Sequence, residues 1–581
     1  MTRHLRFHRS ETLKISGRSM LGWQTLAWTG AVTLLLFLMG LRNHTLWDYH
    51  EPYVGGIIRE MAASGDWVLP TLNGAPYLEK PPLFYALGAL CCRVFGSSDP
   101  WVLRLPSALL ATATVGWVSY LGWRLSSARA GGWAGFMVAT NALFFVCGHE
   151  AIVDMALTAA VTFSLSLAYL AIVEPFYRER WVGWFWLSLG LAFLAKGVFG
   201  PVIILAPLAV VFWLQRGTRL LRAFLRPNWG MALAVLLVLG WVLPLGLRKG
   251  GGEFLFEVFV RNSLGRFMAS PDLVSATGNL GEHVEPFYFY FARTPGNVLP
   301  WLAIWGAALW AAIPVGKRPR VSVRYYFLPL AFGLNLVLLS LSEAKRMVYL
   351  MPLVPLSLLH AALWLDLQFP KKRAWAQKPI LVILGVTLAF VGLLGVGFPW
   401  VLVDRVHTHW SLALVLSLGS AGMSGYSLYL LSQRRFPVVL DWTMAQWSLF
   451  LVSFLIFGVP ELDREWRPIL EPFHLAHRLE AQGATVYVGR MAETGLGYAS
   501  LEFKHLLPVA DTPERVQDLL SAEAPVVLLL DTKHYWRGQL KDRVTGAVEI
   551  PTAASRSRKL WDRAPTLVLN APAAALLHTT P

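Results

Sequence analysis

Carboxylates at the ends of apolar runs are the first residues of this sequence that could do chemistry. The candidates are Asp48, Glu51, Glu79 and Asp154, because a carboxylate can accept the proton of a reacting hydroxyl group. Asp154 begins the otherwise apolar run of HEAIVDMAL, where an ionisable side chain is costly and indicates function. An acid in a first helical turn can instead stabilise the helix dipole. His50 lies beside Glu51 and could belong to the site or face solvent.

Cations at the ends of other apolar runs suggest an anionic partner. Lys196 lies in FLAKGVFGP, and Lys345 and Arg346 lie in SEAKRMVYLMP. Such cations could stabilise a phosphate leaving group, although long basic side chains also snorkel at membrane surfaces without further function. His283 in GEHVEPFYFY could bind a phosphate or a metal, or face solvent. A metal site, if the protein has one, would use Glu79 and His283.

The composition predicts a membrane protein with many spans. Of 581 residues, 55% are hydrophobic and 15% are charged, against about 25% charged in soluble proteins, and the mean hydropathy is +0.49. The formal charge of +16 is concentrated in short loops, as the positive-inside rule expects, so nucleic-acid binding is not predicted. The three cysteines stand in apolar surroundings without metal-binding spacing.

About thirteen apolar runs are long enough to cross a bilayer. They fall near residues 21–41, 101–123, 131–147, 155–173, 181–196, 199–215, 229–247, 298–315, 325–342, 349–367, 379–403, 410–431 and 438–458. The apolar segment 83–95 is shorter, and we expect it to be interfacial or re-entrant. If it does not cross and the N-terminus is inside, every basic cluster between spans lies on the inner face. These clusters are Arg124 and Arg129; Arg178 and Arg180; Arg216, Arg219, Arg222 and Arg226; Lys317, Arg318, Arg320 and Arg324; Lys371, Lys372 and Arg373; and Arg434 and Arg435.

This topology predicts three parts and places the candidate chemistry outside. Residues 1–20 form a cytoplasmic tail. Residues 21–459 form the membrane domain, with outer loops 42–100 and 248–297. Residues 460–581 alternate helical and strand-like patterns, which predicts a small soluble α/β domain on the outer face. Its sequence shows no catalytic motif, and we expect a supporting or docking role.

The order of the motifs resembles a known family. The run HEPYVGGIIREMAASGDWVLPTLNGAPYLEKPPLFY, followed by IVDMAL, LAKG, EFLFEVFVRNSLGRF, EHVEPFYFYF, NVLPW and AKRMVYLMPLVP, is similar to the GT-C glycosyltransferases of the lipid A aminoarabinose transferase and protein O-mannosyltransferase-like family. The resemblance covers about residues 40–360 and is weak or absent in the tail. It implies a GT-C-type fold, that is, an all-α polytopic membrane protein with the small α/β domain appended.

The resemblance also implies roles for individual residues. Glu51, Glu79 and Asp154 would surround the acceptor and the reacting centre, with Arg59 in the same outer loop. Lys196, Lys345, Arg346 and His283 would bind the lipid phosphate, and Tyr349 would line the cavity. The family's first acidic pair is Asp-Glu, whereas this chain has His50-Glu51. The base is therefore Asp48, His50 or Glu51.

We expect an integral membrane glycosyltransferase of the bacterial inner membrane with an outward, periplasmic catalytic face. It would transfer a sugar from a polyprenyl-phosphate donor to a lipid, such as lipid A, or to a protein acceptor by an inverting displacement. Membrane lipids would surround it, and no cofactor would be required, although a divalent metal is conceivable. The alternatives are a flippase or transporter of lipid-linked sugars, which should show internal repeats, and a non-catalytic scaffold, which should tolerate loss of the charged residues.

Overall fold

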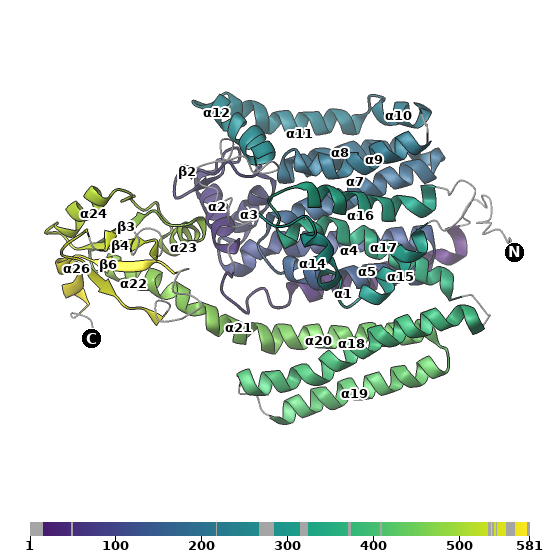
Figure 1. Ribbon diagram of the computed structural model, residues 1–581. Coiled ribbons are helices and arrows are strands. Elements are labelled where there is room, and N and C mark those ends of the chain that lie inside the picture. Colours follow the sequence, from purple (N-terminus) through teal and green to yellow (C-terminus); the bar gives the residue numbers. More distant parts are fainter. Residues whose placement is uncertain are drawn as a thin grey trace.

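A bundle of long apolar helices forms most of the molecule, and a small mixed domain lies at one end of it (Figure 1). The computed structural model describes residues 15–47, 50–215, 218–265, 284–313, 323–369, 374–406, 410–532, 536, 540–541, 543–553 and 564–577. Helices suit the apolar runs because their backbone hydrogen bonds are all made within the segment, which a bilayer requires.

The first half of the chain supplies most of the bundle core. Its helices are α1 (Ile15–Leu38), α4 (Pro100–Leu125), α5 (Ala128–Ala139), α6 (Ala142–Gly148), α7 (Val153–Val173), η1 (Pro175–Tyr177), α8 (Arg178–Lys196), α9 (Phe199–Gln215), α10 (Thr218–Leu225) and α11 (Trp229–Gly246). Side-chain caps mark several starts: Ser127 accepts from the Ala130 N–H at α5 and Asn141 from the Phe144 N–H at α6. Helix α7 is buried over nearly its whole length.

The second half completes the bundle and adds a layer at its edge. Its elements are α12 (Gly251–Phe256), η2 (Glu257–Gly265), α14 (Phe289–Asn297), α15 (Leu302–Ala312), α16 (Val323–Leu341), η4 (Met347–Leu353), α17 (Val354–Gln368), α18 (Ala374–Val406), α19 (Trp410–Ser432), α20 (Phe436–Ser453), η5 (Phe454–Gly458) and α21 (Val459–Trp466). Helices α18, α19 and α20 lie together along one side of the bundle (Figure 1).

Each predicted apolar run coincides with helical structure, but the number of spans is not established. Within the described residues, seven helices are long and apolar enough to cross a membrane, and an eighth span results if α5 and α6 count as one despite their 68° bend. Others, such as α9 and α15, are apolar but shorter. Thirteen spans therefore stays a prediction. The segment 83–95 is the helix α3 (Leu83–Phe95), and its interfacial or re-entrant placement stays a prediction.

The outer loop 42–100 is a folded unit. It contains α2 (Glu51–Ser64), whose first eleven residues are buried, and a hairpin of β1 (Thr71–Leu72) and β2 (Ala75–Pro76). Asn73 and Gly74 turn the hairpin with φ of 49° and 77°, the positive values that this tight turn requires. Gly88 of α3 approaches Ile58 of α2 closely, so the two helices pack together beside the bundle.

The C-terminal region contains a four-stranded sheet of order β3-β4-β6-β5. Strands β3 (Thr485–Gly489) and β4 (Val526–Leu530) are parallel, and β6 (Thr566–Leu569) runs antiparallel to β4 and to β5 (Val548–Ile550). Helices η6 (Arg467–Leu470), α22 (Glu471–Ala481), α23 (Glu493–Phe503), α24 (Pro513–Leu520) and α26 (Ala571–Leu576) accompany the sheet. Helix α23 packs against α2, so this region contacts the outer loop (Figure 1).

Candidate active site

Glu51 belongs to a buried ion pair that fastens the outer loop to the bundle. Its Oε1 accepts from Arg104 Nε at 2.7 Å and from the Ala151 N–H at 2.9 Å. Its Oε2 accepts from Arg104 Nη2 at 2.7 Å and from the Trp47 N–H at 2.8 Å. Glu51 and Arg104 are 1% and 0% exposed, so the pair is out of water and fully hydrogen-bonded. These contacts do not support the predicted proton transfer by Glu51; they give it a positioning role.

The Glu51–Arg104 pair also fixes the position of His50, because His50 directly precedes Glu51 at the start of α2. Its Nδ1 is buried and has no hydrogen-bond partner among the described residues. Burial and the charges of Lys80 and Arg346 lower the pKa of His50 to about 3; Lys196 acts in the same direction and Asp154 in the opposite one. The imidazole is therefore neutral at pH 7 and can accept a proton.

Asp154 and Lys196 form a salt bridge that joins two buried helices. Asp154 lies in the first turn of α7 and Lys196 in the last turn of α8, which are the favourable ends for an acid and a base in the helix dipole. The Lys196 ammonium also lies 3.8 Å from the centre of the Tyr349 ring and 5.3 Å from that of Phe199. The structure thus brings together three residues predicted from the sequence: Asp154, Lys196 and Tyr349.

Lys80 is a cation of the site that the sequence analysis did not select. Its ammonium donates to the Tyr53 hydroxyl at 3.0 Å. The pKa of Lys80 is raised: burial opposes protonation, but the neighbouring Tyr53, Glu79 and Asp154 outweigh it, against the charge of Arg346. The signal was present in YLEKPP, where Lys80 directly follows the selected Glu79.

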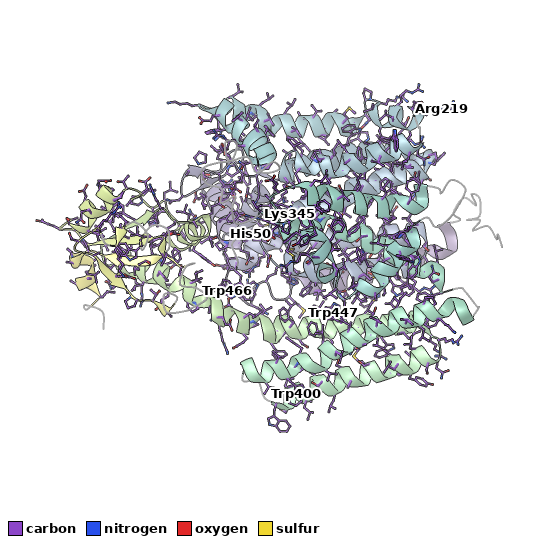
Figure 2. All side chains as sticks on the ribbon, viewed as in Figure 1. His50, Arg219, Lys345, Trp400, Trp447 and Trp466 are labelled. Atoms are coloured by element: carbon purple, nitrogen blue, oxygen red, sulfur yellow. The ribbon has the colours of Figure 1, made fainter. Side chains whose placement is uncertain are left out.

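Lys345 and Arg346 are adjacent but differ in their surroundings. The buried Lys345 ammonium donates to the backbone carbonyls of Glu285, at 2.6 Å, and Glu343, at 3.4 Å. Arg346, by contrast, is one of the charges that act on His50. Figure 2 places His50 and Lys345 where the outer loop meets the bundle. The Lys345 ammonium is therefore held by backbone carbonyls, and the phosphate-binding roles of Lys345 and Arg346 stay predictions.

Of the other predicted residues, two have described contacts, Arg59 and Glu79, and two do not, Asp48 and His283. Arg59 donates to the Ser500 hydroxyl and to the Lys504 carbonyl, so it contacts α23, and these contacts do not support an acceptor role. Glu79 accepts from the Tyr77 hydroxyl at 3.2 Å. Asp48 and His283 lie outside the described residues. Among the described residues, no group of three or more His, Cys, Asp or Glu side chains has a geometry that could hold a metal ion.

Comparisons with known proteins agree with the family resemblance. Residues 79–244 match the family of dolichyl-phosphate-mannose-protein mannosyltransferases. The chain is 28% identical over 355 residues to an undecaprenyl phosphate-alpha-4-amino-4-deoxy-L-arabinose arabinosyl transferase of Aeromonas salmonicida, a match that spans 59% of this chain and 60% of that protein. It is 25% identical over 444 residues to the corresponding transferase 2 of Proteus mirabilis, with 74% of this chain and 70% of that protein covered.

Solved structures show the same fold. The crystal structure of ArnT from Cupriavidus metallidurans bound to undecaprenyl phosphate aligns with a TM-score of 0.71 at 20% identity, covering 95% of this chain and 99% of that one. Its apo state aligns with a TM-score of 0.69 at 19% identity, covering 95% and 98%. The predicted fold class, a multi-pass all-α membrane protein with a small α/β region, is therefore confirmed.

Proposed function

We propose that this chain is an integral membrane glycosyltransferase that transfers a sugar from a polyprenyl-phosphate donor to a lipid acceptor such as lipid A. The similar proteins are named for transfer from an undecaprenyl phosphate sugar. In this chain, the proposal rests on one observation, a cluster of cations at buried polar groups: Lys196 pairs with Asp154 and lies 3.8 Å from the centre of the Tyr349 ring, and Lys80 donates to the Tyr53 hydroxyl. Lys80, Arg346 and Lys196 also act electrostatically on the buried His50. A protein acceptor is the alternative that the mannosyltransferase match leaves open.

The three cations suit the leaving group. When the bond from the sugar to the phosphate breaks, negative charge develops on the phosphate oxygens, and preorganised cations stabilise that charge. We propose that all three cations share this role, with Lys196 also paired with Asp154. The phosphate also offsets the positive charge around His50, so it raises the basicity of the imidazole when donor is bound.

His50 is the proposed general base. The oxygens of Glu51 are occupied by hydrogen bonds, and Asp154 is held by Lys196, whereas His50 Nδ1 has no partner among the described residues. The acceptor oxygen bonds to the anomeric carbon as the carbon–oxygen bond to the phosphate breaks. The acceptor proton passes to His50 Nδ1, and polyprenyl phosphate departs with the bonding electron pair. One such displacement inverts the anomeric centre.

The proposed reaction occurs on the outer, periplasmic face of the bacterial inner membrane. Arg219, from a basic cluster predicted to be inside, lies at the end of the molecule opposite His50 (Figure 2), in agreement with the positive-inside rule. The donor is activated by its own phosphate, so no nucleotide is needed. We also propose that no cofactor is required, so that a chelator leaves the activity unchanged.

Transfer by purified protein in proteoliposomes tests the proposal. The donor is a polyprenyl phosphate that carries a radiolabelled sugar, and the acceptor is lipid A. We expect the wild type to label lipid A and His50→Ala to reduce kcat by about 100-fold or more. Lys541→Met, which removes a lysine that pairs with Glu549 in the tail, is the control and should stay active. If no sugar is transferred and the intact lipid-linked sugar instead crosses the bilayer, the protein is a flippase.

A further inference from the structure

A groove between three helices of the membrane domain carries both charged and apolar side chains. It has a volume of about 430 Å³ and is open to the surface of the molecule. Its walls come from α1, α5 and α20, and include Thr29, Arg129, Trp133, Asp441, Ala445 and Ser448. In Figure 1, α20 lies between the rest of the bundle and α19. Because these helices are apolar and the groove is open, a molecule of the surrounding bilayer can enter it.

Asp441 is a carboxylate in the second turn of the mostly apolar helix α20, and it is exposed. Its Oδ1 accepts from the Trp133 indole N–H at 2.7 Å, which leaves Oδ2 for a second donor. Among the described residues, only Trp133, through this bond, and Arg129, through its charge, act on Asp441. An ionisable side chain in a membrane helix is costly and indicates a function. A cation from outside the protein would therefore stabilise Asp441.

Arg129 supplies the positive charge of the groove. Its Nε and Nη2 donate to Asp366 Oδ1 at 3.2 and 3.0 Å, and Nη1 takes no part in these bonds. The side chain is 45% exposed, and the guanidinium carbon lies 5.0 Å from the centre of the Trp133 ring. Asp366 thus holds the guanidinium in place while one edge can bind an anion. An anion-binding and a cation-binding group therefore both contact Trp133.

The order of residues along the two helices matches an amphipathic ligand. Arg129 is the second residue of α5, and Asp441 also lies near the start of its helix. Apolar residues of the same groove, Phe136 of α5 and Met444 of α20, follow further along each helix. The charged end of the groove is therefore near the helix starts, and its apolar part lies deeper in the bundle. A lipid has the same arrangement, with a polar headgroup at the surface and acyl chains below it.

The groove lies far from the candidate active site. Helix α4 begins at Pro100, directly after the outer loop, and ends at Leu125, shortly before α5 begins. Arg129 is therefore at the end of α4 that is remote from the outer loop. It also belongs to a basic cluster that the positive-inside rule places on the inner face. A lipid in this groove would come from the inner leaflet.

We propose that this groove binds one phospholipid with a primary ammonium headgroup, with Arg129 at its phosphate and Asp441 at its ammonium. The two residues are not paired with each other, since Arg129 pairs with Asp366, so each is able to bind the opposite charge of one headgroup. A quaternary ammonium has no N–H to donate to Asp441, and a headgroup without an amine would bring only negative charge to it. This inference does not depend on the proposed function.

Lipid binding to the purified full-length protein tests this site. Delipidated protein in detergent is titrated with phosphatidylethanolamine, phosphatidylcholine and phosphatidylglycerol that carry identical acyl chains, and native mass spectrometry measures the bound lipid. We expect the wild type to bind one phosphatidylethanolamine about 10-fold more tightly than either other lipid, as charge-assisted hydrogen bonds allow. Asp441→Asn, which can still accept from Trp133, should remove this preference. Asp441→Glu, which keeps the charge, should retain part of it.

A second variant tests the groove without changing its charges. Ala445 is an exposed residue of the groove wall, so Ala445→Trp should fill the space and weaken the binding of phosphatidylethanolamine. Ala421→Trp is its matched control, because Ala421 is an exposed residue of α19 outside this wall. Glu179→Gln is the control for Asp441→Asn, because Glu179 is a 91% exposed acid of α8. Both controls should keep the wild-type preference.

The outcomes separate recognition of the amine from other effects. Equal affinity of the wild type for the three lipids, or tighter binding of phosphatidylglycerol, would overturn the inference. An unchanged preference in Asp441→Asn would do the same, because the carboxylate would then not contact the headgroup. Equal weakening of all three lipids by Asp441→Asn would indicate a structural effect and would also overturn it. Sugar transfer is not measured, so failure of the proposed function leaves these results unaffected.

Discussion

The proposed role of His50 depends on the residues that surround it. The Glu51–Arg104 pair fixes the start of α2 and therefore the position of the imidazole. Burial, together with the cations Lys80, Arg346 and Lys196, keeps the imidazole neutral near pH 7, and the phosphate of a bound donor would raise its basicity. An ordinary exposed histidine would be partly protonated below a pH of about 6.5 and would lose the capacity to accept a proton.

The pH profile should reveal this depressed pKa. The pH dependence of kcat/KM reports ionisations of the free enzyme, and the base is active above its folded pKa, which is about 3 for His50. We expect kcat/KM to show no acid loss between pH 7 and 5 that depends on His50. A midpoint at about 6.5 that disappears in His50→Ala would contradict the assignment.

Stability should depend on the same ionisation with a defined sign. Unfolded His50 binds a proton below a pH of about 6.5, whereas native His50 does so only near 3. Protons therefore favour the unfolded state, and the stability contributed by His50 is lost as pH falls from about 6.5 toward 3, by up to about 1.4 kcal/mol per pH unit. His50→Asn should fall less steeply in Tm over this window than the wild type. Equal slopes would contradict the burial of His50.

The family has an Asp where this chain has His50, which suggests the substitution His50→Asp. A carboxylate at residue 50 would face the same three cations and could also accept a proton. We expect His50→Asp to retain transfer within about 10-fold of the wild type, while His50→Ala loses about 100-fold or more. Initial rates in proteoliposomes distinguish the two. If Asp and Ala are equally inactive, residue 50 does not transfer the proton.

Arg104 should be indispensable for stability. Its removal leaves Glu51 charged, buried and without its main partner, which costs roughly 3–5 kcal/mol. We expect Arg104→Met to lower the Tm strongly and the double variant Arg104→Met/Glu51→Gln to recover part of the loss. Thermal unfolding in detergent measures both. If the double variant is no more stable than Arg104→Met, charge burial is not the reason for the loss.

The types and the order of the residues predicted part of the candidate site. The remainder depends on the directions in which side chains point, which the sequence does not show. The sequence indicated His50, Asp154, Lys196 and Arg346, because ionisable residues beside apolar runs stand out, and the family resemblance indicated Tyr349. It could not show that backbone carbonyls hold the Lys345 ammonium. That contact depends on the bridge between Val284 and Ala344, which brings the Glu285 carbonyl to the Lys345 ammonium.

At the scale of elements, the contact of α2 with α23 connects the tail to the site. Arg59 donates to the Ser500 hydroxyl, which donates to Glu60, and the Asn73 amide and the Leu507 backbone bond reciprocally. Much of the outer-loop run that carries the family resemblance thus binds the tail. Helix α23 was not predicted, because ETGLGYASLEF contains two glycines and lacks a clear apolar period. The close approach of α2 requires one of them, Gly497.

A methyl group at Gly497 should loosen this contact. Its Cβ would overlap backbone atoms of Pro52 and Tyr53, and such overpacking costs roughly 1–3 kcal/mol. We expect Gly497→Ala to make the tail more sensitive to limited proteolysis and to reduce transfer. The control is Gly419→Ala in α19, where a Cβ meets nothing within 4 Å. Unchanged proteolysis of Gly497→Ala would show that the helices can separate at little cost.

At the scale of the whole molecule, hydrophobicity predicted the architecture better than the number of crossings. Among the described residues, every predicted apolar run contains helical structure, because a helix makes all of its backbone hydrogen bonds within the segment. The described structure has seven helices that are clearly long enough, or eight with the bent pair. Short and broken helices such as α5 with α6 are stabilised by neighbouring helices, and a sequence does not state which neighbours those will be.

The two ends of the molecule should lie on opposite sides of the membrane. Arg219 lies at the end of the molecule opposite His50 (Figure 2), and Lys541 is a half-exposed residue of the C-terminal region. Positive charge is retained on the cytoplasmic face, so we expect Arg219 on that face and Lys541 on the outer one. An impermeant maleimide should therefore label Lys541→Cys in intact spheroplasts. It should label Arg219→Cys only in inverted vesicles. The parent protein, with Cys91, Cys92 and Cys147, measures the background. Labelling of both variants from the same side would contradict the prediction that the C-terminal region lies on the outer face.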